Sequence, residues 1–200
     1  MTSLLERCVA NSALLRNSQH VSRLAQLQRD SGCVSETFWR QVASGGGVAW
    51  SGRAVATVLN ALSRLAEQGG AGSRMAAVQG VQSSLLLAAQ DYARDMNARE
   101  VANALNGVGK LHRSCAWHSS AHDCEALLQA AGRTAVHMNA QEVANTWNAL
   151  YGLGIPPGEA LRKELLCTSR ERCRGSAVPV MFGKPLLNNV LKFDHLQLQK

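Results

Sequence analysis

Hydrophobic residues recur along this chain with the spacing of an α-helix, in three copies of one pattern. The copies span residues 50–65, 96–111 and 138–153. Within each copy, apolar side chains stand at positions i, i+4, i+7 and i+10, which lie on one face of a helix. The equivalent positions are Val55, Leu59, Leu62 and Leu65, then Val101, Leu105, Val108 and Leu111, then Val143, Trp147, Leu150 and Leu153. Each copy is predicted to be an amphipathic helix with one buried stripe.

The second and third copies, MNAREVANALNGVGKL and MNAQEVANTWNALYGL, also share most of their polar residues. Asn97 and Asn139 are N-cap candidates, and Glu100 and Glu142 follow three residues later, which is the spacing of a capping box. In the first copy Ser51 can cap the helix, but no acid follows it at that spacing. The sequence GLGIPP ends the third copy, because glycine and proline commonly close helices. We therefore expect the three helices to begin at equivalent residues.

The intervals between copies, 46 and 42 residues, hold a second helical pattern. It covers residues 75–92 and 124–136, and shorter segments at 37–42 and 158–167 fit the same place. Each copy then forms a hairpin with the helix before it. A hairpin of this size buries its stripe only by stacking on its neighbours. The predicted fold is all-α, an α-solenoid of about three to four stacked hairpins, each of roughly 42–46 residues.

The two ends of the chain differ from the repeats. The first 29 residues contain four arginines and one acid, which is typical of an organellar targeting segment and equally of an ordinary basic first helix. The fragment CVANSALL at residues 8–15 partly matches a further copy. After residue 174 the period stops, and proline and irregular spacing favour an extended tail. The predicted organisation is a basic N-terminal segment at 1–30, a helical-repeat domain at 31–174 and an extended tail at 175–200.

Polar residues gather on the face of each repeat helix opposite the apolar stripe. On a helical wheel with Val101 at zero, four side chains of the second copy fall at about 140–200°. With their equivalents in the other copies, the set is Arg53, Thr57, Asn60 and Arg64, then Arg99, Asn103, Asn106 and Lys110, then Gln141, Asn145, Asn148 and Gly152. Stacked helices would align these residues as a ladder of amides flanked by basic side chains.

Such a ladder suits single-stranded RNA. Amides hydrogen-bond base edges as donor or acceptor, and arginine or lysine holds phosphate. Two other interpretations stay open. In one, the repeated asparagines hydrogen-bond the neighbouring helix and set the repeat geometry, which applies best to Asn103 and Asn145. In the other, they hydrogen-bond the backbone of an extended protein segment, and this binding requires no flanking basic residues.

The segments NAREVANALNGVGKL and NAQEVANTWNALYGLGIPP resemble the repeats of the octotricopeptide-repeat group, the heptatricopeptide repeats and the helical region of FAST-kinase-like proteins. Their hallmark is a helix of the type P-Q-x-L-A-N-x-L-W-A-L-A-x-L-G. The matching residues are Gln141, Val143, Ala144, Asn145, Trp147, Ala149, Leu150, Leu153 and Gly154, and in the second copy Val101, Ala102, Asn103, Leu105 and Leu111. The resemblance covers about residues 50–157. It implies a mitochondrial or plastid α-solenoid that binds RNA, or a structural subunit of an organellar ribosome.

This sequence also departs from the family. Its spacings are longer than those typical of the repeats, and the tail shows no nuclease-like terminal domain. Neither a base-reading code nor a catalytic role therefore follows from the resemblance.

Net charge supports an anionic partner. The chain carries a net charge of +7 and has a pI near 9.4, which is compatible with nucleic acid. The densest basic run includes Arg170, Arg172 and Arg174. We interpret this run either as an end of the protein that contacts phosphate or as a salt-bridged helix surface. No apolar run reaches the roughly 18 residues of a membrane span, so none is expected.

One cluster of residue types that bind metals follows the second copy. It contains His112, Cys115, His118, His122 and Cys124. Zinc takes such ligands, but the cluster falls in a predicted connector without a paired motif elsewhere, so a solvated loop is the main interpretation and no metal site is predicted. The glycine-rich SGGGVAWSG lacks the GK[ST] ending of a phosphate-binding loop, and no GxSxG is present. We expect neither a cofactor nor enzyme activity.

These features predict a non-catalytic RNA-binding helical-repeat protein of an organellar ribonucleoprotein, with a mitochondrial ribosomal subunit and its rRNA as the leading candidate. The competing predictions are a protein–protein interaction scaffold and a transcript-specific factor for RNA stability or processing. The expected partners are RNA and neighbouring proteins, in the mitochondrion or alternatively the plastid. The candidate RNA-binding residues are Arg53, Asn60, Arg64, Arg99, Asn103, Asn106, Lys110, Gln141, Asn145, Asn148, Arg170, Arg172 and Arg174.

Overall fold

The computed structural model describes residues 15–44, 47–68, 79–114 and 117–174, and this part of the protein is all-α, as predicted. The helices are α3 (Ser18–Ser31), α4 (Glu36–Ala43), α5 (Gly52–Glu67), α7 (Gln82–Tyr92), α8 (Ala98–Arg113), α9 (Glu125–Thr134), α10 (Ala140–Leu153) and α11 (Glu159–Arg174), with 3₁₀ turns η1 (Ala93–Asp95), η2 (His122–Cys124) and η3 (Ala135–His137). None of these helices is long and apolar enough to cross a bilayer. The predicted tail at 175–200 and most of the fragment at 8–15 lie outside the described residues.

The repeat helices begin where their capping residues predict. The Asn97 side chain accepts a hydrogen bond from the Glu100 backbone N–H at 3.0 Å, and the Glu100 carboxylate accepts from the Asn97 N–H at 3.1 Å. Asn139 and Glu142 form the same reciprocal pair. In α5, the Ser51 side chain caps the helix without a partner acid. Both predicted capping boxes are confirmed, and each cap contributes about 1 kcal/mol.

Helix α3 follows the same pattern as the three predicted copies. The interval along the chain from α3 to α5 is shorter than the intervals between the copies. The N-cap of α3 is Asn17, whose side chain accepts from the Gln19 N–H at 2.8 Å. Val21, four residues after the cap, is fully buried, as is Val55 at the same place in α5. Four capped helices, α3, α5, α8 and α10, therefore share one register.

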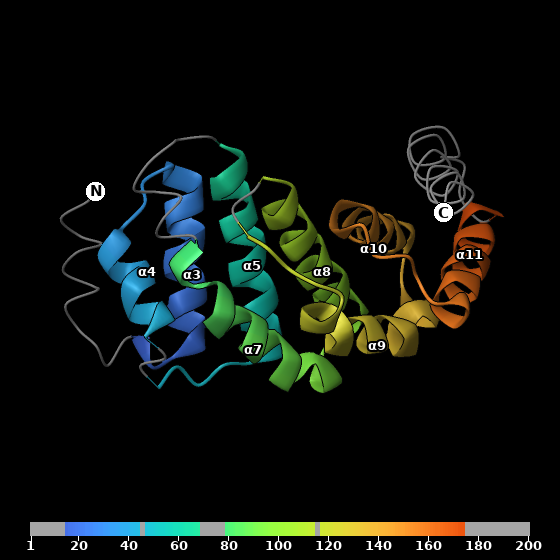
Figure 1. Ribbon diagram of the computed structural model, residues 1–200, viewed down its shortest axis with the longest axis horizontal. Helices are drawn as coiled ribbons and strands as arrows, with labels where there is room; N and C mark the ends of the chain where they lie inside the picture. The colour runs from blue at the N-terminus through green and yellow to red at the C-terminus, as the bar shows by residue number, and fades with distance from the viewer. Residues whose placement is uncertain (1–14, 45–46, 69–78, 115–116, 175–200) are drawn as a thin grey trace.

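The helices form two rows along the long axis of the molecule (Figure 1). Helices α3, α5, α8 and α10 pack in chain order as one row, and α4, α7, α9 and α11 follow one another as the other. Helices α3 and α5 are parallel, since the Ser22 hydroxyl lies 3.5 Å from the Ala54 carbonyl near their N-terminal ends and Gln68 donates to the Arg29 carbonyl near their C-terminal ends. Helices α5 and α8 are parallel too, because they also meet near both ends. Gly52 lies against Met96 at their N-terminal ends, and Lys110 Nζ lies 3.0 Å from Glu67 Oε1 at their C-terminal ends. We call α3, α5, α8 and α10 the repeat row.

The predicted apolar stripes form the core. Leu59, Leu105 and Leu150, one from each copy, have no exposed surface. They belong to one continuous apolar cluster that includes residues of both rows. Full burial of a leucine contributes about 1.5–3 kcal/mol, so the stripes are a main source of stability, as their pattern predicts.

Glycines on α8 allow the repeat row to pack closely. A Cβ atom on Gly107 would stand 2.9 Å from the carbonyl carbon of Leu59 in α5, and one on Gly109 would stand 2.8 Å from the Cα of Ala149 in α10. Both distances are shorter than a Cβ atom tolerates next to backbone. Helix α8 thus approaches each neighbour through one glycine, and these contacts bring the polar faces of successive helices together.

Hydrogen bonds in the second row repeat from unit to unit. The Arg133 guanidinium donates to the Ala93 carbonyl at 3.0 Å, and the Thr168 hydroxyl donates to the Ala135 carbonyl at 3.2 Å. Ala93 begins η1 and Ala135 begins η3, at equivalent places before the two capping boxes. Helices α9 and α11 of the second row therefore each hold a turn that leads into a repeat helix.

Candidate nucleic-acid interface

The predicted ladder lies on the face of the repeat row opposite the core stripe. Its arginines are exposed: Arg53, Arg64 and Arg99. Its asparagines are half-buried: Asn60, Asn103, Asn106, Asn145 and Asn148. Gln141 is exposed at the start of α10. The helical wheel therefore places these side chains correctly at the surface, with the amides recessed between helices.

Part of this ladder converges in one recess. A hollow of about 450 Å³ lies across α3, α5 and α8. Four predicted residues line it together, namely Arg53, Asn60, Arg99 and Asn103. The other lining residues are Gln26, Arg29, Ala56, Thr57, Asn97 and Glu100. We call this recess the α5–α8 hollow.

A second recess of about 330 Å³ adjoins the first, between α3 and α5. It shares Gln26, Arg53 and Thr57 with the α5–α8 hollow. Its other lining residues are Gln19, Ser22, Arg23, Ser51 and Ala54. The two recesses share a wall and form one track across α3, α5 and α8. We call the second recess the α3–α5 hollow.

The track is positively charged. Arg23, Arg53 and Arg99 form no ion pair with any other residue that the structure describes. The α3–α5 hollow is lined by two arginines and no carboxylate. In the α5–α8 hollow the Glu100 carboxylate accepts from the Asn97 N–H in the capping box. Anions are also favoured near helix N-termini by the helix dipole, so charge and dipole act in the same direction.

The recessed amides differ in their partners. The side chains of Asn60, Asn103 and Asn106 hydrogen-bond no other residue within the described ranges, so Asn103 does not serve to hold a neighbouring helix. In α10, by contrast, the Gln141 side chain donates to Asn145 Oδ1 at 2.9 Å. The amides beside the track are therefore available to a ligand, and the Gln141–Asn145 pair bonds within its own helix.

Two cations near the C-terminal ends of the repeat row form ion pairs. Lys110, a candidate phosphate contact, lies 3.0 Å from the Glu67 carboxylate, because α5 continues one turn beyond the ladder. Arg29 hydrogen-bonds Asp30 at 2.7 Å. Arg29 lowers the pKa of the Asp30 carboxyl from its usual value, and the charge of Arg64 adds to this effect. Arg29 and Lys110 thus differ from Arg23, Arg53 and Arg99, which have no ion-pair partner among the described residues.

Gly152, the position in the third copy that lacks a basic residue, lies against Arg113 of α8. The Arg113 guanidinium donates to the Asn148 carbonyl at 2.9 Å. A side chain at position 152 would displace this guanidinium, so glycine makes room for a cation from the neighbouring helix. Sequence reasoning missed Arg113 because it stands one turn beyond the ladder positions.

The α3 residues of the track were also missed. Gln19, Arg23 and Gln26 stand at the same distances from Asn17 as Arg53, Thr57 and Asn60 stand from Ser51. In the sequence, α3 was not aligned with the repeat helices, because its interval to α5 is shorter and because residues 1–30 were interpreted as a basic N-terminal segment. The capping sequence Asn-Ser-Gln before a buried valine was the available signal.

The three C-terminal arginines of the predicted set lie on the last turns of α11, in the second row. The structure therefore does not place Arg170, Arg172 and Arg174 beside the track. Their side chains lie outside the described part of the chain.

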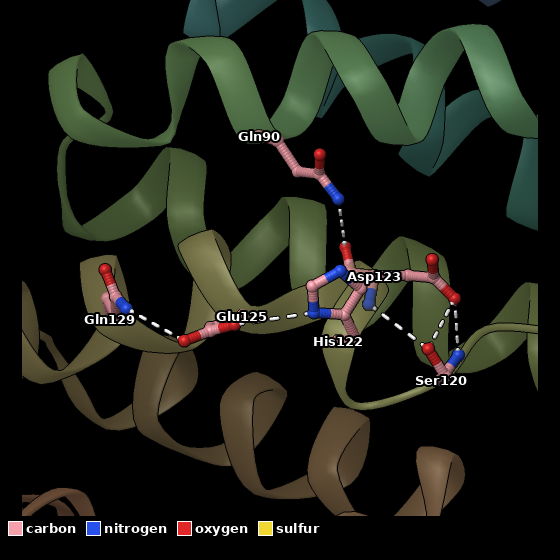
Figure 2. A network of polar contacts seen from close by, with 6 residues as sticks. All are labelled: Gln90, Ser120, His122, Asp123, Glu125 and Gln129. Carbon is pink, nitrogen blue, oxygen red and sulfur yellow. Dashed lines mark hydrogen bonds and ion pairs between the residues drawn. The ribbon is translucent and has the colours of Figure 1, made fainter.

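The histidine- and cysteine-rich connector is held by hydrogen bonds. Asp123 accepts from the Ser120 N–H and hydroxyl, both at 2.7 Å, and Gln90 of α7 donates to the Asp123 carbonyl (Figure 2). The Ser120 hydrogen bonds lower the pKa of the Asp123 carboxyl. His122 Nδ1 lies 3.6 Å from Glu125 Oε2. This network joins the α8–α9 connector to α7.

The metal-ligand residue types in this connector are not grouped. Among the described residues no three His, Cys, Asp or Glu side chains converge on a common point. His118 and His122 are exposed and Cys124 is buried. His112 Nδ1 accepts from the Ser119 N–H at 3.3 Å. Cys115 lies outside the described residues.

The cysteines are expected to differ sharply in reactivity. Cys167 is exposed, Cys33 is half-buried and Cys124 is buried. Burial, with a smaller effect of the Asp123 charge, raises the pKa of the Cys124 thiol to about 12. Because the thiolate is the reactive form, iodoacetamide at pH 8 should label Cys167 before Cys33, and Cys124 only after unfolding, among the three cysteines whose exposure the structure describes. Peptide mass spectrometry measures this order, and rapid labelling of Cys124 in the folded protein would contradict the structure.

No protein-family model matches this chain, and comparison with curated proteins finds no match.

Proposed function

We propose that this protein is a non-catalytic α-solenoid of stacked helical hairpins that binds single-stranded RNA along its repeat row. The observation that carries the proposal is the α5–α8 hollow, where unpaired arginines and unbonded amides line one recess. Arg53 and Arg99 supply the cations that phosphates require, and Asn60 and Asn103 supply paired donor and acceptor groups for base edges. This combination of groups matches the chemistry of a nucleotide.

Single-stranded RNA fits this surface better than a duplex. The amides are half-buried between helices, so they reach an unpaired base that enters the recess. In an A-form duplex the base edges with most information lie in a deep, narrow groove. The recess volume of about 450 Å³ also lies within the range of ordinary ligand sites.

The proposed setting is an organellar ribonucleoprotein, with a mitochondrial ribosomal subunit and its rRNA as the leading candidate. Two features support this setting: the resemblance of the copies at residues 96–111 and 138–153 to organellar RNA-binding repeats, and the basic composition of the first 29 residues. A row of four repeat helices offers a short track. That length suits a component held in place by neighbouring proteins better than a factor that recognises a long transcript sequence.

Filter binding of the full chain to a single-stranded RNA across a salt titration tests the proposal. Contacts from Arg53 and Arg99 to two phosphates predict a slope of log K against log salt of about −1.4 or steeper, at roughly 0.7 per phosphate. Between 50 and 200 mM salt the affinity should then fall at least roughly 7-fold. Absence of binding, or binding independent of salt, would favour the protein-interaction scaffold, whose basic residues serve no phosphate.

A further inference from the structure

We infer that the α3–α5 hollow is a phosphate-binding site that extends the RNA track onto α3, with Arg23 and Arg53 as its cations. The inference rests on the proposed function and assigns a distinct role to a helix that the repeat pattern did not include. The two arginines come from neighbouring parallel helices and line the same recess of about 330 Å³.

The free hydrogen-bond donors of this hollow are nearly all cationic or amide groups. The Ser22 hydroxyl donates to the Ser18 carbonyl at 2.8 Å, and the Thr57 hydroxyl donates to the Arg53 carbonyl at 2.7 Å. Both protons are therefore used within the helices. The donors that remain are the two guanidinium groups, the amides of Gln19 and Gln26, which hydrogen-bond no other described side chain, and the Ser51 hydroxyl, which accepts from the Ala54 N–H. A recess rich in free donors and without a lining carboxylate is suited to an oxyanion.

Arg23 marks a change in chemistry along the repeat row. It stands six residues after its N-cap, where α5 has Thr57, α8 has Asn103 and α10 has Asn145. An amide at this position can hydrogen-bond a base, whereas a guanidinium favours phosphate. The α3 unit is thus suited to hold the backbone of the strand, whereas α8, on the other side of α5, is suited to bond a base. Gln26 and Arg53 line both hollows, so a strand passes from one to the other without crossing the second row.

Arg23→Gln in the full chain tests this site, with Arg94→Gln as the matched control. Both arginines are exposed and form no described ion pair, but Arg94 lies in η1 and lines neither hollow. Arg23→Gln should weaken binding of a single-stranded RNA about tenfold at 50 mM salt and reduce the salt slope by about 0.7. Arg23→Lys should keep the slope, and Arg94→Gln should change neither quantity. Equal melting temperatures for all variants establish that folding is intact.

The outcomes separate this inference from the function on which it rests. If the unmodified protein binds RNA with the expected slope but Arg23→Gln behaves like Arg94→Gln, the α3–α5 hollow is not a phosphate site and the proposed function stands. If the unmodified protein binds no RNA, both proposals fail. A loss that adds to that of Arg99→Gln, which lines only the α5–α8 hollow, supports two phosphate contacts on one track, since contacts that share no partner contribute independently.

Discussion

Replacing Gly109 by leucine is expected to lower the free energy of unfolding by about 3 kcal/mol, because α8 can no longer approach α10. A Cβ atom at this position would already stand 2.8 Å from the Cα of Ala149 and 3.0 Å from its carbonyl oxygen. These are backbone atoms of a packed helix, so they cannot rotate away as a side chain does. Overpacking at such a contact costs about 1–3 kcal/mol and sometimes more, a large part of the 5–15 kcal/mol typical of a domain.

Gly132 provides the matched control. It also lies inside a helix, α9, but a Cβ atom there would meet no atom within 4 Å. Gly132→Ala should therefore raise stability by about 0.5–1 kcal/mol through helix propensity alone. Gly109→Ala should lower it despite the same gain in propensity. Urea unfolding followed by circular dichroism measures both changes, and an equal stabilisation by the two alanines would refute close packing of the repeat row.

The double substitution Arg53→Gln with Arg99→Gln is expected to weaken RNA binding about 100-fold at low salt. Each charged hydrogen-bonded contact contributes about 1.5 kcal/mol, or roughly tenfold in affinity, and the two side chains line the same hollow. The salt slope should fall by about 1.4. Stability should change little, because both guanidinium groups are exposed and form no ion pair among the described residues.

Arg40→Gln with Arg94→Gln removes the same charge from another part of the molecule. Arg40 lies on α4 in the second row, with 77% of its side chain exposed, and Arg94 lies in η1. If long-range attraction alone retained RNA, both double variants would lose affinity equally. The proposed track predicts a loss for Arg53 and Arg99 that greatly exceeds the loss for the control, and filter binding distinguishes the two cases.

The sequence predicted the parts of the fold that depend on local rules. The spacing of Val101, Leu105 and Val108 identified the buried stripe, and Asn97 with Glu100 identified the start of α8. Capping and amphipathicity act within one helix, so they are visible without knowledge of its neighbours. The close approach through Gly107 and Gly109 was not predicted, because a glycine's role in packing depends on the helix opposite it.

The candidate site was predicted only in part, because the positions on one helix are visible in the sequence whereas contacts between helices are not. The wheel placed Asn60 and Asn103 on one surface, and the structure brings both into the α5–α8 hollow. Pairing between helices could not be seen in the sequence, so the ion pair of Lys110 with Glu67 was missed. The helix carrying Arg23 was missed because its interval from α5 breaks the period, although its cap and its buried valine follow the pattern.

Photocrosslinking of the full chain to a single-stranded RNA containing 4-thiouridine, followed by peptide mass spectrometry, tests whether RNA binds along the repeat row. We expect crosslinks to the peptides at residues 54–64 of α5 and 100–110 of α8, which carry Asn60 and Asn103. We also expect loss of these crosslinks in the Arg53→Gln, Arg99→Gln variant. Crosslinks confined to α7 and α9 in the second row, or none at all, would contradict binding of RNA along the repeat row.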